Sequence, residues 1–177
     1  MNKGLPGLAG VDHVAFTVPD LEEATRFFVE VIGCKLIFEI GPFIAEDDWM
    51  AVHLGVHPRA VIRKLRYLTC RRGPALELFE YEAPDQAEVL PRNSDHGGHH
   101  LAFYVEDMEA AVAHLRQAGV EMQGEPTVMG EGPSGGLTWL YFKAPWGLQL
   151  ELVCYPKGLA CEAEAGVTLW SPRKSAI

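Results

Sequence analysis

The stretch GVDHVAFTVPDLEEA, from Gly10 to Ala24, returns later in the chain as GGHHLAFYVEDMEAA, from Gly97 to Ala111. The matching residues keep a constant offset of 87, from His13 and His100 at one end to Ala24 and Ala111 at the other. A register held over this length indicates that the chain contains two copies of one structural unit.

Each copy begins with alternating apolar residues, as in a half-buried strand, and continues into a helical run that an aspartate opens. The helical runs end at Gly33 and Gly119, where a left-handed cap is expected. A second pair of matching segments, LELFEY and LELVCY, follows at an offset of 74. Each copy therefore predicts strand, helix and three further strands, with strands near 11–18, 34–40, 60–71 and 75–82 and near 98–105, 120–128, 136–143 and 147–154.

The predicted fold class is α+β, with two βαβββ modules that pair their sheets around a central metal-binding cavity. One helix covers only one face of a four-stranded sheet, so the other face needs a partner. The predicted boundaries are 8–83 for the first module, with an insertion at about 44–60 that forms a short helix and a turn, 95–156 for the second module, and 157–177 for a C-terminal tail. The modules together are expected to make one domain.

The alternation of strand side chains separates polar from apolar positions. Val14, Phe16 and Val18 share the face under the helix, so His13 points to the opposite face, and the same argument sends His100 there. In LELFEY and LELVCY it places Glu77 and Glu151 on that face as well. Satisfied core histidines and solvated glutamates are the ordinary alternative. Buried carboxylates facing each other are costly, however, and a divalent cation would resolve that cost.

With these residues in place, the chain resembles the vicinal oxygen chelate superfamily, which includes glyoxalase I, methylmalonyl-CoA epimerase, extradiol dioxygenases and bleomycin-binding proteins. The resemblance covers about residues 8 to 156, and its carriers are DHVAFTVPDLEEATRFF, ELFEY, GHHLAFYVEDMEAAVAHL and APWGLQLELV. It implies paired βαβββ modules and the metal ligands His13, Glu77, His100 and Glu151. It also implies a homodimer.

The resemblance further implies the reaction class. A glutamate at position 77 favours the isomerase, epimerase and lyase members, in which a substrate with adjacent oxygens chelates the ion and a proton moves next to its carbonyl. Glu151 is the preferred base and Glu77 the second catalytic candidate. The ligand set suits zinc, nickel, cobalt, manganese or iron(II). No residues that would contact glutathione or coenzyme A are recognisable.

Aromatic residues provide the candidates for substrate binding. Tyr104 shares the face of His100, and Trp139 and Tyr141 share one face of their strand. Trp49 lies in the insertion. Ordinary packing is the alternative role for each of them, except that the position of Tyr104 favours a hydrogen bond from its hydroxyl to substrate.

Two other functions remain open from the sequence. An iron(II) extradiol-type ring-cleaving dioxygenase would bind its iron with a facial triad that includes His13 or His100 and one glutamate. The presence of a glutamate at position 77 makes this function less favoured. A protein that sequesters a ligand, as bleomycin resistance proteins do, would not need all four metal-binding residues. Oxygen uptake with a catechol would favour the dioxygenase.

Composition restricts the partners and the compartment. The net charge of −9 argues against nucleic acid, and the basic stretch from Pro58 to Arg72 is interpreted as a solvated edge strand, or as an anchor for an anionic substrate group. No apolar run suits a membrane span or a signal peptide. Four cysteines without paired spacing are expected to be reduced thiols, which predicts a cytoplasmic protein. The expected partner is the small-molecule substrate with adjacent oxygens that the resemblance implies.

Overall fold

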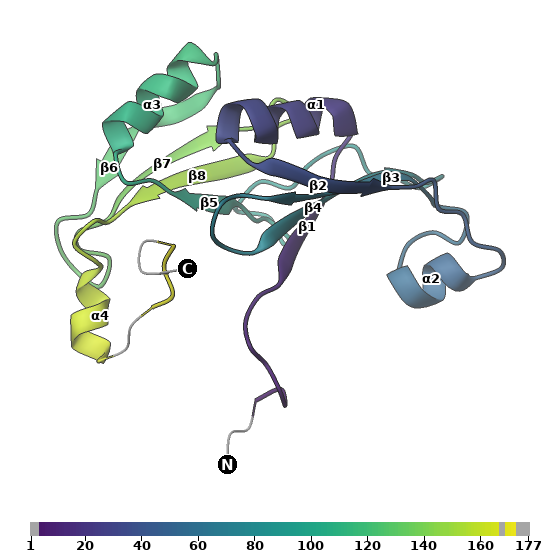
Figure 1. Cartoon of the computed structure of the whole chain (residues 1–177), viewed down its shortest axis with the longest axis horizontal. Helices are drawn as coiled ribbons and strands as arrows, with labels where there is room; N and C mark the ends of the chain where they lie inside the picture. The colour runs from purple at the N-terminus through teal and green to yellow at the C-terminus, as the bar shows by residue number, and fades with distance from the viewer. Residues whose placement is uncertain (1–3, 167–168, 173–177) are drawn as a thin grey trace. The chain divides into compact units, whose positions relative to one another are not determined.

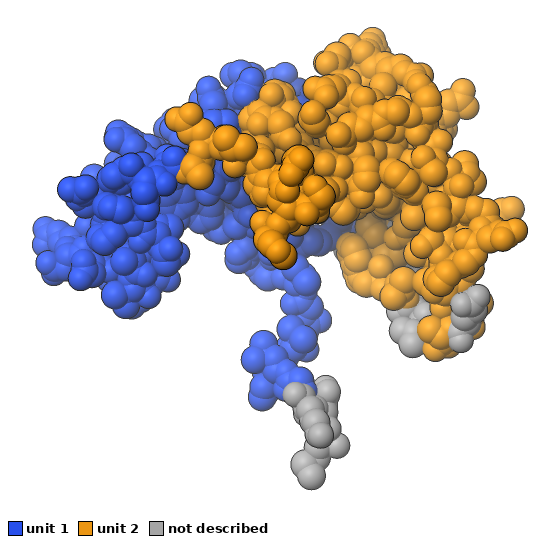
Figure 2. All heavy atoms as spheres, turned by 180° about the vertical axis from the view of Figure 1, so that it is seen from behind, with its two compact units in different colours: residues 1–86 blue, residues 87–177 orange. Residues whose placement is uncertain are grey.

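The computed structural model describes residues 4–166 and 169–172. The chain divides into two compact units, Met1–Gln86 and Ala87–Ile177 (Figure 2). Each unit contains one four-stranded mixed sheet, and each follows the order strand, helix, strand, strand, strand. The predicted pair of βαβββ modules is therefore confirmed.

The first unit has the strand order β1-β4-β3-β2. Strands β1 and β4 run parallel, and the other neighbours are antiparallel. Helix α1 lies over one face of this sheet (Figure 1). The elements of this unit are β1 His13–Thr17, α1 Leu21–Arg26, η1 Phe27–Ile32, β2 Lys35–Ile40, α2 Trp49–Leu54, β3 Val61–Thr69 and β4 Ala75–Glu82.

The second unit repeats this topology with the order β5-β8-β7-β6, and its outer strand β5 is again parallel to β8. The elements of this unit are β5 Leu101–Tyr104, α3 Met108–Gln117, β6 Met122–Val128, β7 Thr138–Lys143, β8 Gln149–Cys154 and α4 Ala160–Ala165. Helix α4 lies in the tail, where the sequence predicted no element. Residues 167–168 and 173–177 of the predicted tail are outside the described residues.

Both modules begin their helix with the predicted aspartate cap. The Asp20 carboxylate accepts a hydrogen bond from the Glu23 backbone N–H at 2.8 Å, and Asp107 accepts one from Ala110 at 3.0 Å. The first helix differs from the second because its later half, η1, is π-helical and ends at Gly33 with a φ of 87°. Gly119, one residue after the cap of α3, also has a positive φ, of 71°.

The faces of the sheets follow the predicted alternation. Leu76 and Leu78 of β4 are buried on the helix side, and Leu150 and Leu152 of β8 are buried in the same way. Because side chains alternate along a strand, Glu77 and its repeat mate project from the other face of their sheets.

The insertion packs against that other face of the first sheet. Helix α2 buries Met50 in a cluster with Ile62 and Leu65 of β3, and Phe79 and Tyr81 of β4 pack against the cluster. The insertion thus forms the predicted short helix and covers the part of the Glu77 face that carries Phe79 and Tyr81.

The basic stretch from Pro58 to Arg72 is not an edge strand, contrary to one interpretation of the sequence. Its strand β3 lies between β2 and β4. Arg66 is buried, and its guanidinium contacts the carboxylates of Glu22 and Glu39 and the hydroxyl of Thr25. A charged residue tolerates burial when its partners are this complete, and here the partners come from α1 and β2.

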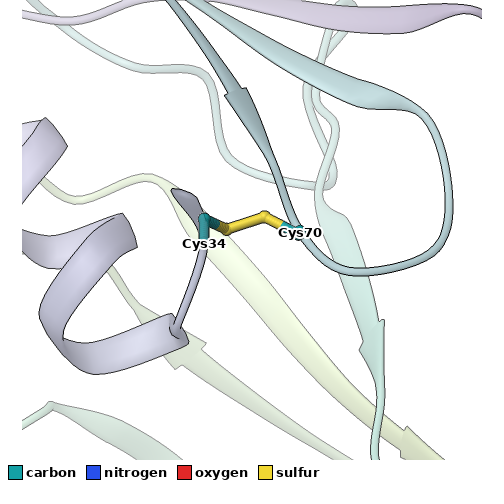
Figure 3. The surroundings of a disulfide bond; sticks show 2 residues. All are labelled: Cys34 and Cys70. Carbon is teal, nitrogen blue, oxygen red and sulfur yellow. A yellow bond between two sulfur atoms is a disulfide. The ribbon is translucent and has the colours of Figure 1, made fainter. Parts of the chain in front are cut away.

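Reduced thiols were the wrong expectation for two of the four cysteines. Cys34 and Cys70 form a disulfide (Figure 3), while Cys154 and Cys161 are free thiols. The register of β2 with β3 pairs Lys35 with Thr69, so the residues just outside this pair meet across the sheet with their Cα atoms 4.2 Å apart. Their separation of 36 residues gave no sign of this contact in the sequence.

In the part of the chain that the structure describes, no helix has the length and apolar character needed to cross a bilayer. The tail instead packs on its own unit. The backbone N–H groups of Ala160 and Cys161, at the start of α4, donate to the carbonyl oxygens of Gly135 and Pro133, each at 3.0 Å. The tail therefore fixes the loop that precedes β7.

Replacement of Arg66 by alanine is expected to lower the free energy of unfolding by about 2 kcal/mol, because two carboxylates lose their buried partner. Arg63→Ala is the matched control on the same strand, since Arg63 pairs with Glu82 while both side chains remain mostly exposed. That variant should cost less than about 1 kcal/mol in urea unfolding. Equal losses in the two variants would contradict the structural role of Arg66.

The Glu22 carboxylate predicts an acid dependence of stability. Hydrogen bonds from Arg66 and then from Lys64 lower the pKa of Glu22 to about 2 from 4.5. A carboxyl whose pKa is lower in the folded state stabilises the fold above its unfolded pKa, and this contribution is lost as the pH falls from 4.5 toward 2. Glu22→Gln should therefore flatten the dependence of unfolding free energy on pH in this window, and an unchanged pH dependence in this variant would contradict the role of Glu22.

Candidate functional site

The first unit places His13 beside Glu77. The imidazole Nε2 of His13 lies 3.6 Å from a carboxylate oxygen of Glu77. Parallel pairing of β1 with β4 sets Ala15 opposite Glu77. His13, two residues before Ala15, therefore projects from the same face of the sheet as Glu77. Glu77 is 20% exposed and His13 is 42% exposed, so the pair is open on one side.

The carboxylate of Asp12 and the phenol of Tyr67 lie on the Nδ1 side of His13, away from Glu77. Asp12 Oδ1 lies 2.8 Å from Nδ1 of His13, which leaves the Nε2 of that ring toward Glu77. The Tyr67 hydroxyl donates to the same Asp12 oxygen at 3.3 Å. Tyr67 is the cross-strand neighbour of Glu77, and its ring stacks on Phe38 with centroids 5.0 Å apart.

The second unit builds the equivalent pair from His100 and Glu151. The His100 Nε2 lies 3.1 Å from a carboxylate oxygen of Glu151, whose side chain is only 12% exposed. On the other side of the ring, the Asn93 side-chain amide lies 3.4 Å from Nδ1 of His100. The Tyr141 ring meets His100 edge to face, with centroids 5.1 Å apart.

The local electrostatics differ between the two pairs. The hydrogen bond that His13 Nδ1–H donates to the Asp12 carboxylate, with the charge of Glu77, raises the pKa of His13. Burial raises the pKa of Glu151, and His100 opposes that shift. Burial raises the pKa of Tyr67 and of Tyr141, and the neighbouring carboxylates add to it.

Each pair has the donor chemistry and the spacing of two ligands of one ion. Nitrogen and oxygen ligands about 2.1 Å from a divalent ion, at angles between octahedral and tetrahedral, lie about 3.0–3.4 Å from one another. The 3.1 Å separation in the second unit lies within this range, and the 3.6 Å separation in the first unit lies just above it. No group of three or more histidine, cysteine or acidic side chains suited to a metal occurs among the described residues. Each unit thus holds two of the four predicted ligands.

The aromatic candidates separate into three groups. Tyr141 contacts His100, and Trp139 contacts Tyr141 with ring centroids 5.1 Å apart. Tyr104 packs against Tyr155 at 4.9 Å. Trp49 packs against the rings of Phe43 and His53, so its contacts lie within the insertion and its surroundings rather than at either pair.

Sequence reasoning missed Asp12, Tyr67 and Asn93. The offset of 74 that relates Glu77 to Glu151 also relates Tyr67 to Tyr141, so an extension of that alignment would have found Tyr67. Asp12 directly precedes a predicted ligand and has no equivalent in the second copy, where His99 stands. Asn93 lies in the connection before β5, and no pattern in the sequence points to it.

The chain is a duplicated βαβββ protein. Each of its modules carries a histidine–glutamate pair at the equivalent positions of its sheet. The family model of the Glyoxalase/Bleomycin resistance protein/Dioxygenase superfamily matches residues 10–152. The chain belongs to this superfamily, and the predicted resemblance is confirmed.

Relatives within the superfamily include epimerases. The chain is 48% identical over 176 residues to a 2-epi-5-epi-valiolone epimerase of Actinomyces sp., a match that covers 98% of this chain and 94% of the relative. It is 30% identical over 125 residues to an ethylmalonyl-CoA/methylmalonyl-CoA epimerase of Cereibacter sphaeroides, covering 69% and 81% of the two chains. A glyoxalase family protein from Bacillus cereus shares the fold, with a TM-score of 0.64, 23% identity and coverage of 86% and 97%.

Proposed function

We propose that the chain is a divalent-metal-dependent epimerase that acts on a hydroxylated cyclic ketone of the 2-epi-5-epi-valiolone type. The observation that carries this proposal is the pair of equivalent histidine–glutamate contacts, at 3.6 Å in the first unit and 3.1 Å in the second. The substrate class rests on the relative that is 48% identical along nearly the whole chain.

His13, Glu77, His100 and Glu151 would hold one ion together, with the modules paired either within a chain or across a homodimer. The ion would be zinc, nickel, cobalt, manganese or iron(II), as the ligand types suit each of these. When bound, such an ion supplies Lewis-acid polarisation to a carbonyl oxygen and the hydroxyl oxygen next to it. A homodimer stays a prediction, which the exposed apolar side chains of β2 support.

The two glutamates would move the proton. Epimerisation next to a carbonyl removes a proton from one face of a carbon and returns a proton to the other face. We assign Glu151 as the base because its more buried carboxylate is protected from water, and Glu77 as the group that serves the opposite face. Tyr141, beside His100, and Trp139 next to it would contact the substrate, and Tyr104 and Trp49 are weaker candidates.

A small uncharged substrate agrees with the charges of the first unit. On β3, Arg63, Lys64 and Arg66 each form ion pairs with carboxylates of the same unit. These cations are therefore engaged and do not offer an anchor for the phosphates of coenzyme A.

The metal site can be tested by elemental analysis of protein purified without chelators. His13→Ala and Glu151→Ala should each lose tightly bound stoichiometric metal, because each removes one of the four side chains proposed to bind the ion and so weakens its binding. His53→Ala, which removes an exposed imidazole from α2, should retain it. Full metal content in both ligand variants would exclude the proposed site.

The reaction can be tested by proton exchange in deuterated water. The metal-loaded protein should introduce deuterium next to the carbonyl of 2-epi-5-epi-valiolone, as nuclear magnetic resonance would show. Glu151→Gln should slow the exchange by about 10²–10⁴-fold, the usual contribution of a general base. Glu109→Gln is the matched surface control.

Methylmalonyl-CoA and a catechol serve as the comparison substrates for this assay. Exchange on the thioester without exchange on the cyclic ketone would contradict the substrate class. Oxygen consumption with the catechol would instead support the dioxygenase. Stoichiometric binding without any exchange would support a sequestering protein.

A further inference from the structure

The two histidines of the candidate site receive different support at Nδ1. In the first unit, a carboxylate oxygen of Asp12 lies 2.8 Å from His13 Nδ1. In the second unit, the Asn93 amide lies 3.4 Å from His100 Nδ1. Whichever way this amide is turned, it presents a neutral group at a longer distance, so the second contact is the weaker one.

Divergence of the repeat explains the difference. The residue that corresponds to Asp12 at the offset of 87 is His99, and its own Nδ1 lies 3.0 Å from the carbonyl oxygen of Gly97. The second copy therefore has no carboxylate at the position that supports the first histidine.

Asp12 makes a second contact, although its side chain is 85% exposed. Besides its contact with His13, it accepts a hydrogen bond from the hydroxyl of Tyr67, and Tyr67 stacks on Phe38. A carboxylate at Nδ1 keeps the imidazole proton on that nitrogen and leaves the lone pair of Nε2 for an ion that His13 would share with Glu77. It also makes Nε2 a stronger electron-pair donor to such an ion.

We propose that Asp12 is a positioning residue that makes His13 the principal imidazole anchor of the metal ion, with His100 as the weaker anchor. The inference rests on the proposed metal-dependent function and deepens it, because it assigns unequal parts to two ligands that the duplication would make equivalent. It implies that the first module supplies the firmer half of the site.

Binding of Co²⁺ to metal-free full-length protein tests this proposal without any activity measurement. Affinity is read from competition with a chromophoric chelator, and the visible absorption of bound Co²⁺ reports its coordination. Asp12→Ala should weaken binding by about 10–100-fold and change the absorption band, as loss of such support usually does. Asp12→Asn keeps an acceptor without the charge and should restore part of the affinity.

Two variants control for position and charge. Asn93→Ala should weaken binding by less than about threefold, since its contact is neutral and long. Asp85→Asn, which neutralises an exposed aspartate in the connection between the units, should bind Co²⁺ as the unaltered protein does. Thermal unfolding of the metal-free variants checks their folding, and Asp12→Asn decides the question if Asp12→Ala does not fold.

Affinity within twofold of the unaltered protein in both Asp12 variants would overturn the proposal and leave the proposed function standing. An equal loss in Asn93→Ala and Asp12→Ala would also overturn it, because the two histidines would then be equally supported. Failure of the unaltered protein to bind Co²⁺ would remove both this inference and the metal-dependent function.

Discussion

Parallel pairing of the first strand with the last strand of each module is the constraint on which the candidate site depends. In the first unit, β1 lies beside β4, and in the second unit, β5 lies beside β8. This pairing brings together residues 64 positions apart, His13 and Glu77, and residues 51 positions apart, His100 and Glu151. The helix and the second and third strands along the chain of each module can therefore change in length without separating the histidine from its glutamate.

The two copies have the same histidine and glutamate but differ in the side chains around them. In the first module, Asp12 links His13 to Tyr67 of β3. In the second module, Tyr141 contacts His100 without such a carboxylate between them, and Trp139 lies beside it. The side chains that contact the two equivalent histidines therefore differ between the modules.

The sequence predicted those features that depend on short periods and on repetition. Strand alternation placed His13, Glu77 and Glu151 on the correct faces, and the aspartate caps marked the starts of both helices. Prediction from the sequence failed for features that depend on which strands become neighbours in the sheet. The disulfide between Cys34 and Cys70 and the burial of Arg66 both follow from the position and register of β3 in the sheet.

The same limit applies to the candidate site. Asp12 lies next to His13 in the chain, yet its role depends on Tyr67, which reaches it from β3. Asn93 reaches His100 from a connection without regular structure. Sequence periodicity selects the face from which a ligand projects, whereas the residues that support that ligand are chosen by tertiary neighbours.

We propose that each module contributes one histidine and one glutamate to a single divalent ion. The number of tightly bound ions per chain tests it most directly, measured by elemental analysis against a quantified protein concentration after purification without chelators. A shared four-ligand site predicts one ion per chain. Two ions per chain, one for each pair, would contradict the account, and so would a protein that binds none when divalent ions are supplied.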